Sequence, residues 1–241
     1  CPVRIVLREA RRALDGRASP TERLEGVAGG AWSADGQTYY YLIYDDASRP
    51  YQLRRHRLGA DPAGDVVVWT ETDEAFHLSV ELSRSQRFVL VRSASATSVE
   101  WRSLDARAAE PPLEVVVPRQ PGVEYELDHA GESYYLLTNA EAPTFELFLV
   151  PVDRRERGAW TRVVAGRPEV TLEGVEAFRD FVVLHGRSGG LSRLWVQRST
   201  PPGEPAGALD PIELPEPTYE VWAGDNREFD ATYYRFGYSS G

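Results

Sequence analysis

A serine flanked by glycines is the first feature of this chain whose residue types could support catalysis. Gly186-Arg187-Ser188-Gly189-Gly190 matches G-x-S-x-G, the sharp turn that presents the nucleophile of many serine hydrolases. That turn needs a strand before the serine and a helix after it. A strand is expected at 181–185, but residues 191–196 alternate in polarity like a second strand. The sequence therefore predicts a hairpin at Ser188, and we expect Ser188→Ala to leave any activity unchanged.

The histidines are the other candidates for proton transfer or metal binding, and there are four of them: His56, His77, His129 and His185. A catalytic triad needs a histidine within reach of a serine and oriented by a carboxylate. These histidines fall in different parts of the chain, mostly within expected strands. None of the histidine spacings typical of zinc sites occurs. We therefore expect no catalytic residue, no metal site and no cofactor in this chain.

Carboxylates are the third kind of residue that could do chemistry here. Six lie in or near short apolar runs that recur along the chain: Glu81, Glu126, Asp128, Glu173, Glu176 and Asp225. If the first five line a common channel, they would attract cationic peptides. The alternative is that they are solvated groups near the ends of strands. Paired carboxylates about 5–10 Å apart in a sugar-sized pocket would instead favour a glycosidase or a lyase.

These residues must be positioned by a repeating unit of short strands. The stretch 30–69 contains four apolar runs separated by Gly, Asp and Pro, which is the pattern of four strands. The same order of runs returns about every 47 residues, and Leu53, Glu100, Leu147 and Leu194 stand at equal steps. A four-stranded unit with a period of roughly 40–50 residues is typical of a β-propeller blade.

The repeat predicts an all-β fold, a partial β-propeller with four-stranded antiparallel blades and about five blade-equivalents in all. Residues 1–25 would end a preceding blade, and 218–241 would supply the first two strands of a further one. Four blades are expected between them, at about 26–71, 72–119, 120–168 and 169–217. We expect such an incomplete arc to expose blade faces and strand edges at both ends.

Two expected strands in the last third of the chain are defined only by short apolar runs. The fourth strand of the last full blade is expected at 212–214, and the second strand of the final segment at 232–236. The connection 200–211 is rich in Pro, Ala and Gly and should be a surface loop.

Composition excludes several classes of function. The net charge is −10, whereas a nucleic-acid-binding surface is basic, so nucleic acid is not an expected partner. No apolar run approaches the length of a membrane span, and no basic-then-apolar signal segment opens the chain. The single cysteine, Cys1, cannot form a disulfide within the chain, which fits a reducing compartment.

Several motifs resemble the propellers of the prolyl oligopeptidase family. The stretch 27–36, Val-Ala-Gly-Gly-Ala-Trp-Ser-Ala-Asp-Gly, resembles a blade opening of that family. Further motifs are similar to its oligopeptidase B group, also called protease II: 49–52, 55–59 with Asp61-Pro62, 122–125, 136–139 and 172–175. The run 234–240 is similar to the segment shortly before that family's catalytic domain. The resemblance covers nearly all of the chain from Leu24 onward.

The resemblance implies a cytosolic serine peptidase that cleaves short peptides after Arg or Lys. In such enzymes an α/β-hydrolase domain carries the catalytic Ser, Asp and His, and a seven-bladed propeller caps the active site and keeps folded proteins out. That hydrolase domain would lie downstream of this chain, so no catalytic residue carries over. We expect a non-catalytic, substrate-gating propeller in the cytoplasm. Its expected partners are a C-terminal hydrolase domain and short cationic peptides, with no membrane. The alternative is a stand-alone propeller that serves as a scaffold for protein–protein interaction.

Overall fold

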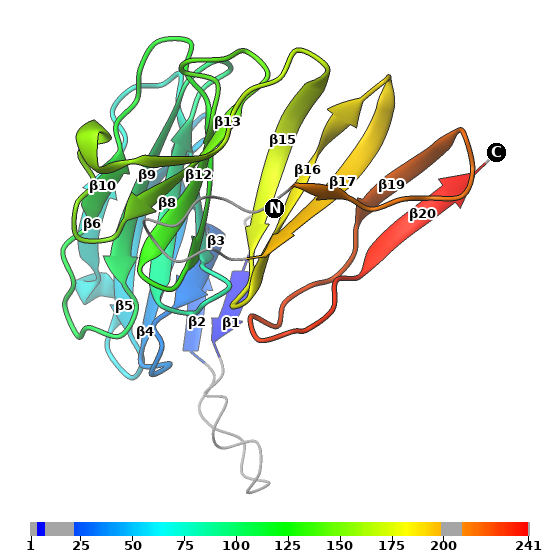
Figure 1. The fold of residues 1–241 in the computed structure, drawn as a ribbon. Coiled ribbons are helices and arrows are strands. Elements are labelled where there is room, and N and C mark those ends of the chain that lie inside the picture. The colour runs from blue at the N-terminus through cyan, green and yellow to red at the C-terminus, as the bar shows by residue number, and fades with distance from the viewer. Residues whose placement is uncertain (1–3, 8–21, 199–208, 241) are drawn as a thin grey trace, which may run out of the picture. The chain divides into compact units, whose positions relative to one another are not determined.

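The computed structural model describes residues 4–7, 22–198 and 209–240, and the described residues are almost entirely β-structure (Figure 1). They form twenty strands and two single-turn 3-10 helices, Pro62–Gly64 and Arg157–Ala159. Four antiparallel sheets have four strands each, and in every one the strand order follows the chain. This up-and-down arrangement of four strands per repeat confirms the predicted all-β fold with four-stranded blades.

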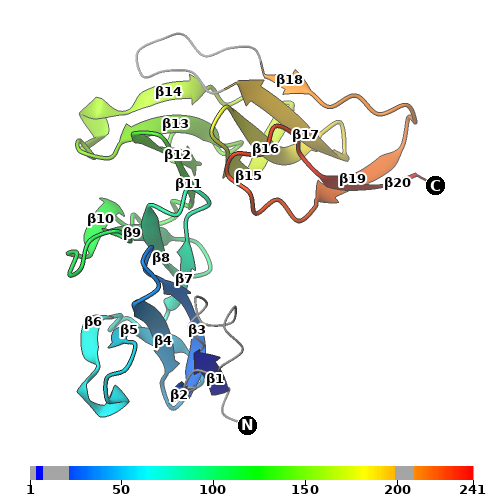
Figure 2. The ribbon, with the colours of Figure 1, turned by 90° about the horizontal axis from the view of Figure 1, so that it is seen from below.

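The chain divides into two compact units, Cys1–Pro121 and Gly122–Gly241. The described part of the first unit holds a strand pair and two full sheets, shown in chain order in Figure 2. The pair is β1 (Arg4–Leu7) with β2 (Glu22–Glu25). The first sheet is β3 (Val27–Trp32), β4 (Thr38–Tyr44), β5 (Pro50–Arg57) and β6 (Val66–Thr70). The second sheet is β7 (His77–Leu82), β8 (Phe88–Ala94), β9 (Val99–Asp105) and β10 (Glu114–Val117).

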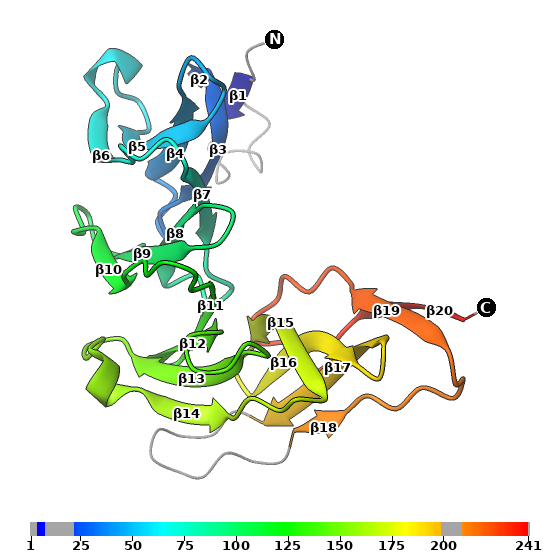
Figure 3. The same ribbon diagram turned by 90° about the horizontal axis from the view of Figure 1, so that it is seen from above.

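The second unit repeats this plan, as Figure 3 shows. Its first sheet is β11 (Tyr125–Ala130), β12 (Ser133–Thr138), β13 (Glu146–Pro151) and β14 (Thr161–Val164). Its second sheet is β15 (Val170–Ala177), β16 (Phe181–Ser188), β17 (Leu191–Arg198) and β18 (Asp210–Pro211). A final strand pair, β19 (Tyr219–Ala223) with β20 (Phe236–Ser240), follows.

The cores of both units lie between successive sheets. In the first unit Tyr40 and Leu53 belong to the same buried cluster as Leu78 and Val89 of the next sheet. In the second unit every residue of β12 is buried, because apolar and aromatic side chains cover both faces of that strand. Each fully buried leucine contributes roughly 1.5–3 kcal/mol relative to exposure. The middle strands therefore attach each blade to its neighbours within a unit.

Two expected strands differ from the structure. The fourth strand of the last full sheet is β18 at Asp210–Pro211, two residues before the expected start. The N–H of Ile212 still donates to the carbonyl of Leu194 at 2.9 Å. The regular strand pairing therefore ends where the apolar run 212–214 begins. The last strand, β20, runs from Phe236 to Ser240 and pairs with β19, whereas 232–236 was expected. Residues 224–235, which connect β19 to β20, include most of the expected strand. The N–H of Gly224 and the carbonyl of Arg235 are hydrogen-bonded at the ends of this connection, and the strand begins only after Arg235.

Candidate functional site

Ser188 does not form a nucleophile elbow. It is the last residue of β16 and pairs with Leu191, the first residue of β17. Gly189 and Gly190 form the turn between them with φ of +60° and +80°, values that suit a two-residue hairpin turn and favour glycine. A strand follows the turn where the elbow requires a helix. The predicted hairpin is confirmed, and its glycines serve the turn.

The histidines lie in separate environments. His56 is fully buried, and its Nδ1 lies 2.8 Å from Oδ1 of Asp65. The other oxygen of Asp65 accepts a hydrogen bond from the hydroxyl of Tyr41 at 2.8 Å. His77 is exposed, while His129 is buried edge-on against Tyr134. Among the described residues no group of three or more His, Cys, Asp or Glu side chains could hold a metal ion.

His185 on β16 belongs to a polar cluster with Glu176 of β15 and Tyr234, which lies just before β20. Its Nε2 lies 2.8 Å from Oε1 of Glu176. The hydroxyl of Tyr234 donates to the same oxygen at 2.7 Å and lies 3.1 Å from Nε2 of His185. The imidazole of His185 thus contacts one carboxylate, that of Glu176, and one phenol, that of Tyr234. The cluster ties β15 and β16 to the segment that precedes β20.

Glu81 is the one predicted carboxylate in the first unit. It lies on β7, the first strand of its sheet, and its side chain is exposed. Burial by the surrounding protein nevertheless raises the pKa of the Glu81 carboxyl, while the charges of Arg84 and Arg92 oppose that rise. Glu81 is therefore accessible to solvent but lies among protein atoms that limit its hydration.

The four predicted channel carboxylates of the second unit lie on β11 and β15. Asp128 is buried and accepts hydrogen bonds from the main-chain N–H groups of His129 and Ala177, each at 2.7 Å. Glu173 pairs with Arg187 at 3.1 Å on the surface, and Glu176 belongs to the His185 cluster. Glu126 is half-buried on β11. Their role in lining a channel remains a prediction.

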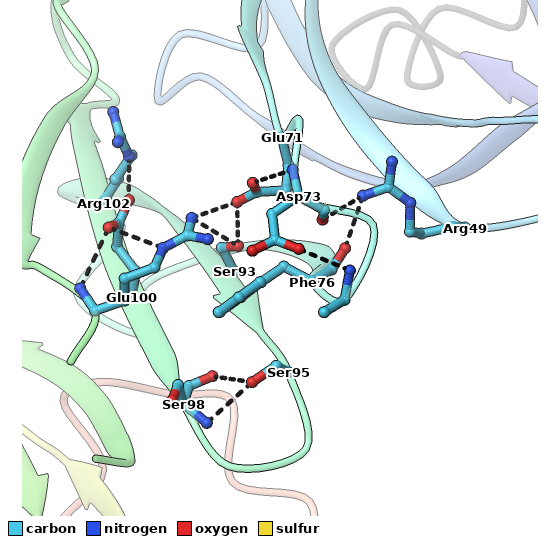
Figure 4. Close-up of polar contacts among 11 residues, drawn as sticks. Arg49, Glu71, Asp73, Phe76, Ser93, Ser95, Ser98, Glu100 and Arg102 are labelled. Carbon is cyan, nitrogen blue, oxygen red and sulfur yellow. Dashed lines mark hydrogen bonds and ion pairs between the residues drawn. The ribbon is translucent and has the colours of Figure 1, made fainter. Parts of the chain in front are cut away.

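Sequence reasoning missed a buried network of carboxylates and arginines in the first unit (Figure 4). Glu71, directly after β6, and Glu100, on β9, are 4% and 6% exposed. Arg119 contacts both carboxylates, and its Nε lies 3.5 Å from Glu100. Ser93 donates to Glu71, and Nε of Arg102 donates to Glu100, each at 2.7 Å. The network links the end of one sheet to three parts of the next.

The electrostatics of this network favour the ionised form of Glu71. Burial alone would raise the pKa of Glu71, but hydrogen bonds from Arg119 and Ser93 outweigh it and hold the pKa below its usual value. The guanidinium of Arg119 also lies over the ring of Phe76, 3.9 Å from its centre. Each buried charge therefore has a partner, as burial of an ionised group requires.

A sequence signal for this network did exist. Glu100 occupies the repeat position that Leu53, Leu147 and Leu194 fill in the other sheets, and those leucines are at most 2% exposed. A carboxylate at a position that is otherwise a buried leucine must have a cationic partner. This exception to the repeat could have been found before the structure, although its partners could not.

Arg49 fixes the connection between the two sheets of the first unit. Its Nε donates to Asp45 at 2.8 Å, and its Nη1 donates to the carbonyls of Asp73 and Phe76 at 2.8 and 3.0 Å. Hydrogen bonds from the main chain and side chain of Arg49 hold the pKa of Asp45 below its usual value. Arg49 thus joins the β4–β5 turn to the β6–β7 connection (Figure 4).

An open cleft of about 400 Å³ lies beside this contact and is lined by Asp45, Asp46, Ala47, Arg49, Glu74 and His77. The ion pair of Asp45 with Arg49 balances one negative charge. Asp46 and Glu74 add two further carboxylates to the lining of the cleft, so its net charge is negative. A cleft with negative net charge would attract cations.

No helix in the described ranges is long and apolar enough to cross a membrane.

Comparison with known proteins identifies the family. Residues 11–240 match the family described as "Prolyl oligopeptidase, N-terminal beta-propeller domain". "Protease 2" of Moraxella lacunata is 31% identical over 209 residues, which are 87% of this chain and 29% of that protein. "Dipeptidyl aminopeptidase BI" of Pseudoxanthomonas mexicana is 31% identical over 211 residues, covering 87% of this chain and 28% of that protein. The chain therefore spans less than a third of these relatives.

Solved structures agree with this result. Oligopeptidase B from Leishmania major has a TM-score of 0.89 and 23% identity, with 99% of this chain and 34% of that chain covered. Oligopeptidase B from Trypanosoma brucei, with covalently bound antipain, has a TM-score of 0.85 and 26% identity over 97% of this chain and 33% of that chain. The resemblance to oligopeptidase B is confirmed, and this chain belongs to the N-terminal β-propeller domain of the prolyl oligopeptidase family.

Proposed function

We propose that this chain is the non-catalytic, substrate-gating part of a serine peptidase of the oligopeptidase B type. The observation that carries the proposal is the family match over residues 11–240. The placement of Ser188 in a glycine hairpin supports it, because the G-x-S-x-G motif at 186–190 is thereby accounted for by the fold. Catalysis is then the task of a C-terminal α/β-hydrolase domain, which is the partner of this propeller.

The gating role follows from the architecture of a propeller. Blades surround a central channel, and a channel of fixed width admits short, extended peptides but excludes folded proteins. Rigid blades suit that role. Buried ion pairs and hydrogen bonds between successive blades, such as those of Glu71 and Asp128, favour such rigidity. We further propose that the protein acts in the cytoplasm.

The substrate preference is proposed to be for peptides that are cleaved after Arg or Lys. The acidic net charge of −10 and the exposed carboxylate of Glu81 on a first strand support a preference for cationic peptides. Such steering weakens as ionic strength rises. A preference that arises in part from the propeller should therefore become smaller at high salt.

The test compares two proteins: this chain alone, and the full-length protein that carries it. Both are assayed with fluorogenic peptides that offer Arg, Lys, Pro or a neutral residue at the cleavage site. Activity in the full-length protein alone, with Arg or Lys preferred, is expected. Activity in this chain that is lost in Ser188→Ala would overturn the proposal. Silence of both proteins toward every peptide would favour the stand-alone scaffold instead.

A further inference from the structure

One hairpin of this chain has an unusually long connection. Five hairpins join the first and second strands of successive sheets, and four of them have connections of two to five residues. The fifth, between β19 and β20, has twelve residues, 224–235. Short connections of this kind usually have two to five residues, and longer ones are often functional. We refer to residues 224–235 as the long loop.

The long loop is held closed at its base by its own hydrogen bonds. The N–H of Gly224 donates to the carbonyl of Arg235 at 2.9 Å. Asn226, only 7% exposed, donates to both of their carbonyls at 3.2 and 2.8 Å and accepts from the N–H of Arg235 at 2.8 Å. These bonds use the main-chain N–H and carbonyl groups of Gly224 and Arg235 and the side-chain amide of Asn226. The long loop is an ordered structure with adjacent ends, like an Ω-loop.

The long loop is also anchored to the preceding sheet, and its anchors gather at one place. The N–H of Arg179 donates to the carbonyl of Phe229 at 3.0 Å, and its Nε donates to Asp230 at 2.7 Å. At the other end of the loop Tyr234 donates to Glu176 at 2.7 Å. Glu176 lies on β15, and Arg179 lies in the turn from β15 to β16. Glu176 is thus on the first strand of that sheet and Arg179 in the turn that follows it, and the hydroxyl of Tyr234 also lies 3.1 Å from Nε2 of His185 on the second strand.

This location gives the long loop a functional meaning in a propeller. The first strand of each blade is the strand nearest the channel, so first-to-second hairpins surround one opening of the channel. Four of these hairpins here are too short to reach far from their own strands. The long loop instead reaches the equivalent turn of its neighbour at Arg179, and Phe229 and Tyr234 pack against that blade.

We propose that the long loop limits the length of peptide that can pass this opening of the channel. The inference rests on the proposed function, because it concerns the same gate. Its exposed surface carries charges of both signs, including Asp225 and Arg227, which pair at 3.0 Å, beside the ring of Tyr233, which is 47% exposed. The long loop acts by occupying space, and its anchors keep it in place.

The experiment uses the full-length protein that carries this chain and two variants. In the first, residues 225–234 are replaced by Asn-Gly, a turn that joins a directly hydrogen-bonded pair such as Gly224 and Arg235. In the second, Asp230→Ala and Tyr234→Phe remove two anchors and keep the loop length. A matched control shortens residues 107–110, an exposed turn between the third and fourth strands of another blade. Circular dichroism and thermal unfolding establish that each variant is folded.

The measurement is kcat/KM for a series of peptides that share one cleavage site and increase in length. Relative to the shortest peptide, the longest should gain at least about threefold in the shortened variant. A gain in the same direction, but smaller, is expected in the anchor variant, and none in the control. An unchanged length profile in folded, active variants overturns the inference. If the shortened variant does not fold, the anchor variant decides. Failure of the proposed function is distinct, because the unaltered protein would then cleave no peptide.

Discussion

The carboxylate of Asp128 on β11 accepts a hydrogen bond from the main-chain N–H of Ala177 on β15, at 2.7 Å, so that one blade satisfies a backbone donor of the next. The second oxygen of Asp128 is bound to the N–H of His129 at 2.7 Å. A buried charged acceptor with two donors cannot be lost without leaving those donors unsatisfied.

Asp128→Ala should therefore lower the free energy of unfolding by about 2–3 kcal/mol, because two buried N–H groups lose their acceptor. Asp128→Asn should cost less, since its amide oxygen can still accept one of the two bonds. Urea unfolding followed by circular dichroism measures both changes. Glu173→Ala is the matched control on the surface and should change stability by less than about 0.5 kcal/mol. Equal effects of the Asp128 and Glu173 variants would contradict the interpretation.

Acid should destabilise the first unit through Glu71. The folded pKa of Glu71 is lower than its usual value of 4.5, so the unfolded chain binds the proton more readily than the folded chain does. The stabilisation is fully present above the unfolded pKa and is lost as the pH falls through the folded pKa. The free energy of unfolding of the natural protein should fall below about pH 5, and Glu71→Gln should show a shallower fall.

At neutral pH Glu71→Gln should cost about 2 kcal/mol, because Arg119 and Ser93 lose a charged acceptor. Glu110→Gln is the control, since Glu110 pairs with Arg55 at 3.1 Å but is 78% exposed. It should leave both the stability and its pH dependence nearly unchanged. Urea unfolding at a series of pH values tests both variants. Parallel curves for the natural protein and Glu71→Gln would refute the role given to this carboxylate.

The repeat and the core could be predicted from sequence, whereas the polar contacts could not. Leu53, Leu147 and Leu194 stand at equal steps, and all lie on third strands in the core, because strand periodicity and burial are properties of short segments. Arg119 and Glu71 are 48 residues apart. Their contact depends on how two connections fold back on one sheet, and no local pattern encodes that. The predicted position of β20 was wrong for the same reason. Hydrogen bonds from Asn226 close the loop before β20, and a pattern of apolar residues does not predict such bonds.

The buried Tyr41–Asp65–His56 contacts should make Asp65 important for stability. The side chains of His56 and Asp65 are 0% and 3% exposed, so removal of the carboxylate leaves a buried imidazole and a buried phenol without it. Asp65→Ala should cost about 3 kcal/mol, and Tyr41→Phe about 1 kcal/mol. Burial and the hydrogen bond to Asp65 raise the pKa of Tyr41 to about 12. Absorbance titration should show one fewer late-ionising tyrosine in Tyr41→Phe, and an unchanged titration would count against this arrangement.

Two equivalent turns offer a test of backbone strain with a built-in control. The turn of the β3–β4 hairpin places Gly36 at φ +67°, and the turn of the β7–β8 hairpin places Gln86 at φ +56°. In both, the N–H of this residue donates to the carbonyl of a serine three residues earlier, at 2.9 and 2.8 Å. A residue with a side chain pays roughly 1–2 kcal/mol for the left-handed conformation. Glycine avoids that cost. It also gives the unfolded chain more conformational entropy, which destabilises the folded protein by about 0.4–1 kcal/mol.

Gln86→Gly should therefore stabilise the protein by about 0.5 kcal/mol, the difference between these two effects. Gly36→Gln should destabilise it by a similar or larger amount, although the space around Gly36 is open within 4 Å of an added Cβ. The cost would then come from the backbone, since no clash exists. Urea unfolding of both variants measures the two signs. Opposite signs are expected because the same left-handed conformation is occupied by glutamine in one turn and by glycine in the other. Two changes of the same sign would show that side-chain contacts, and not the backbone conformation, determine the stability change.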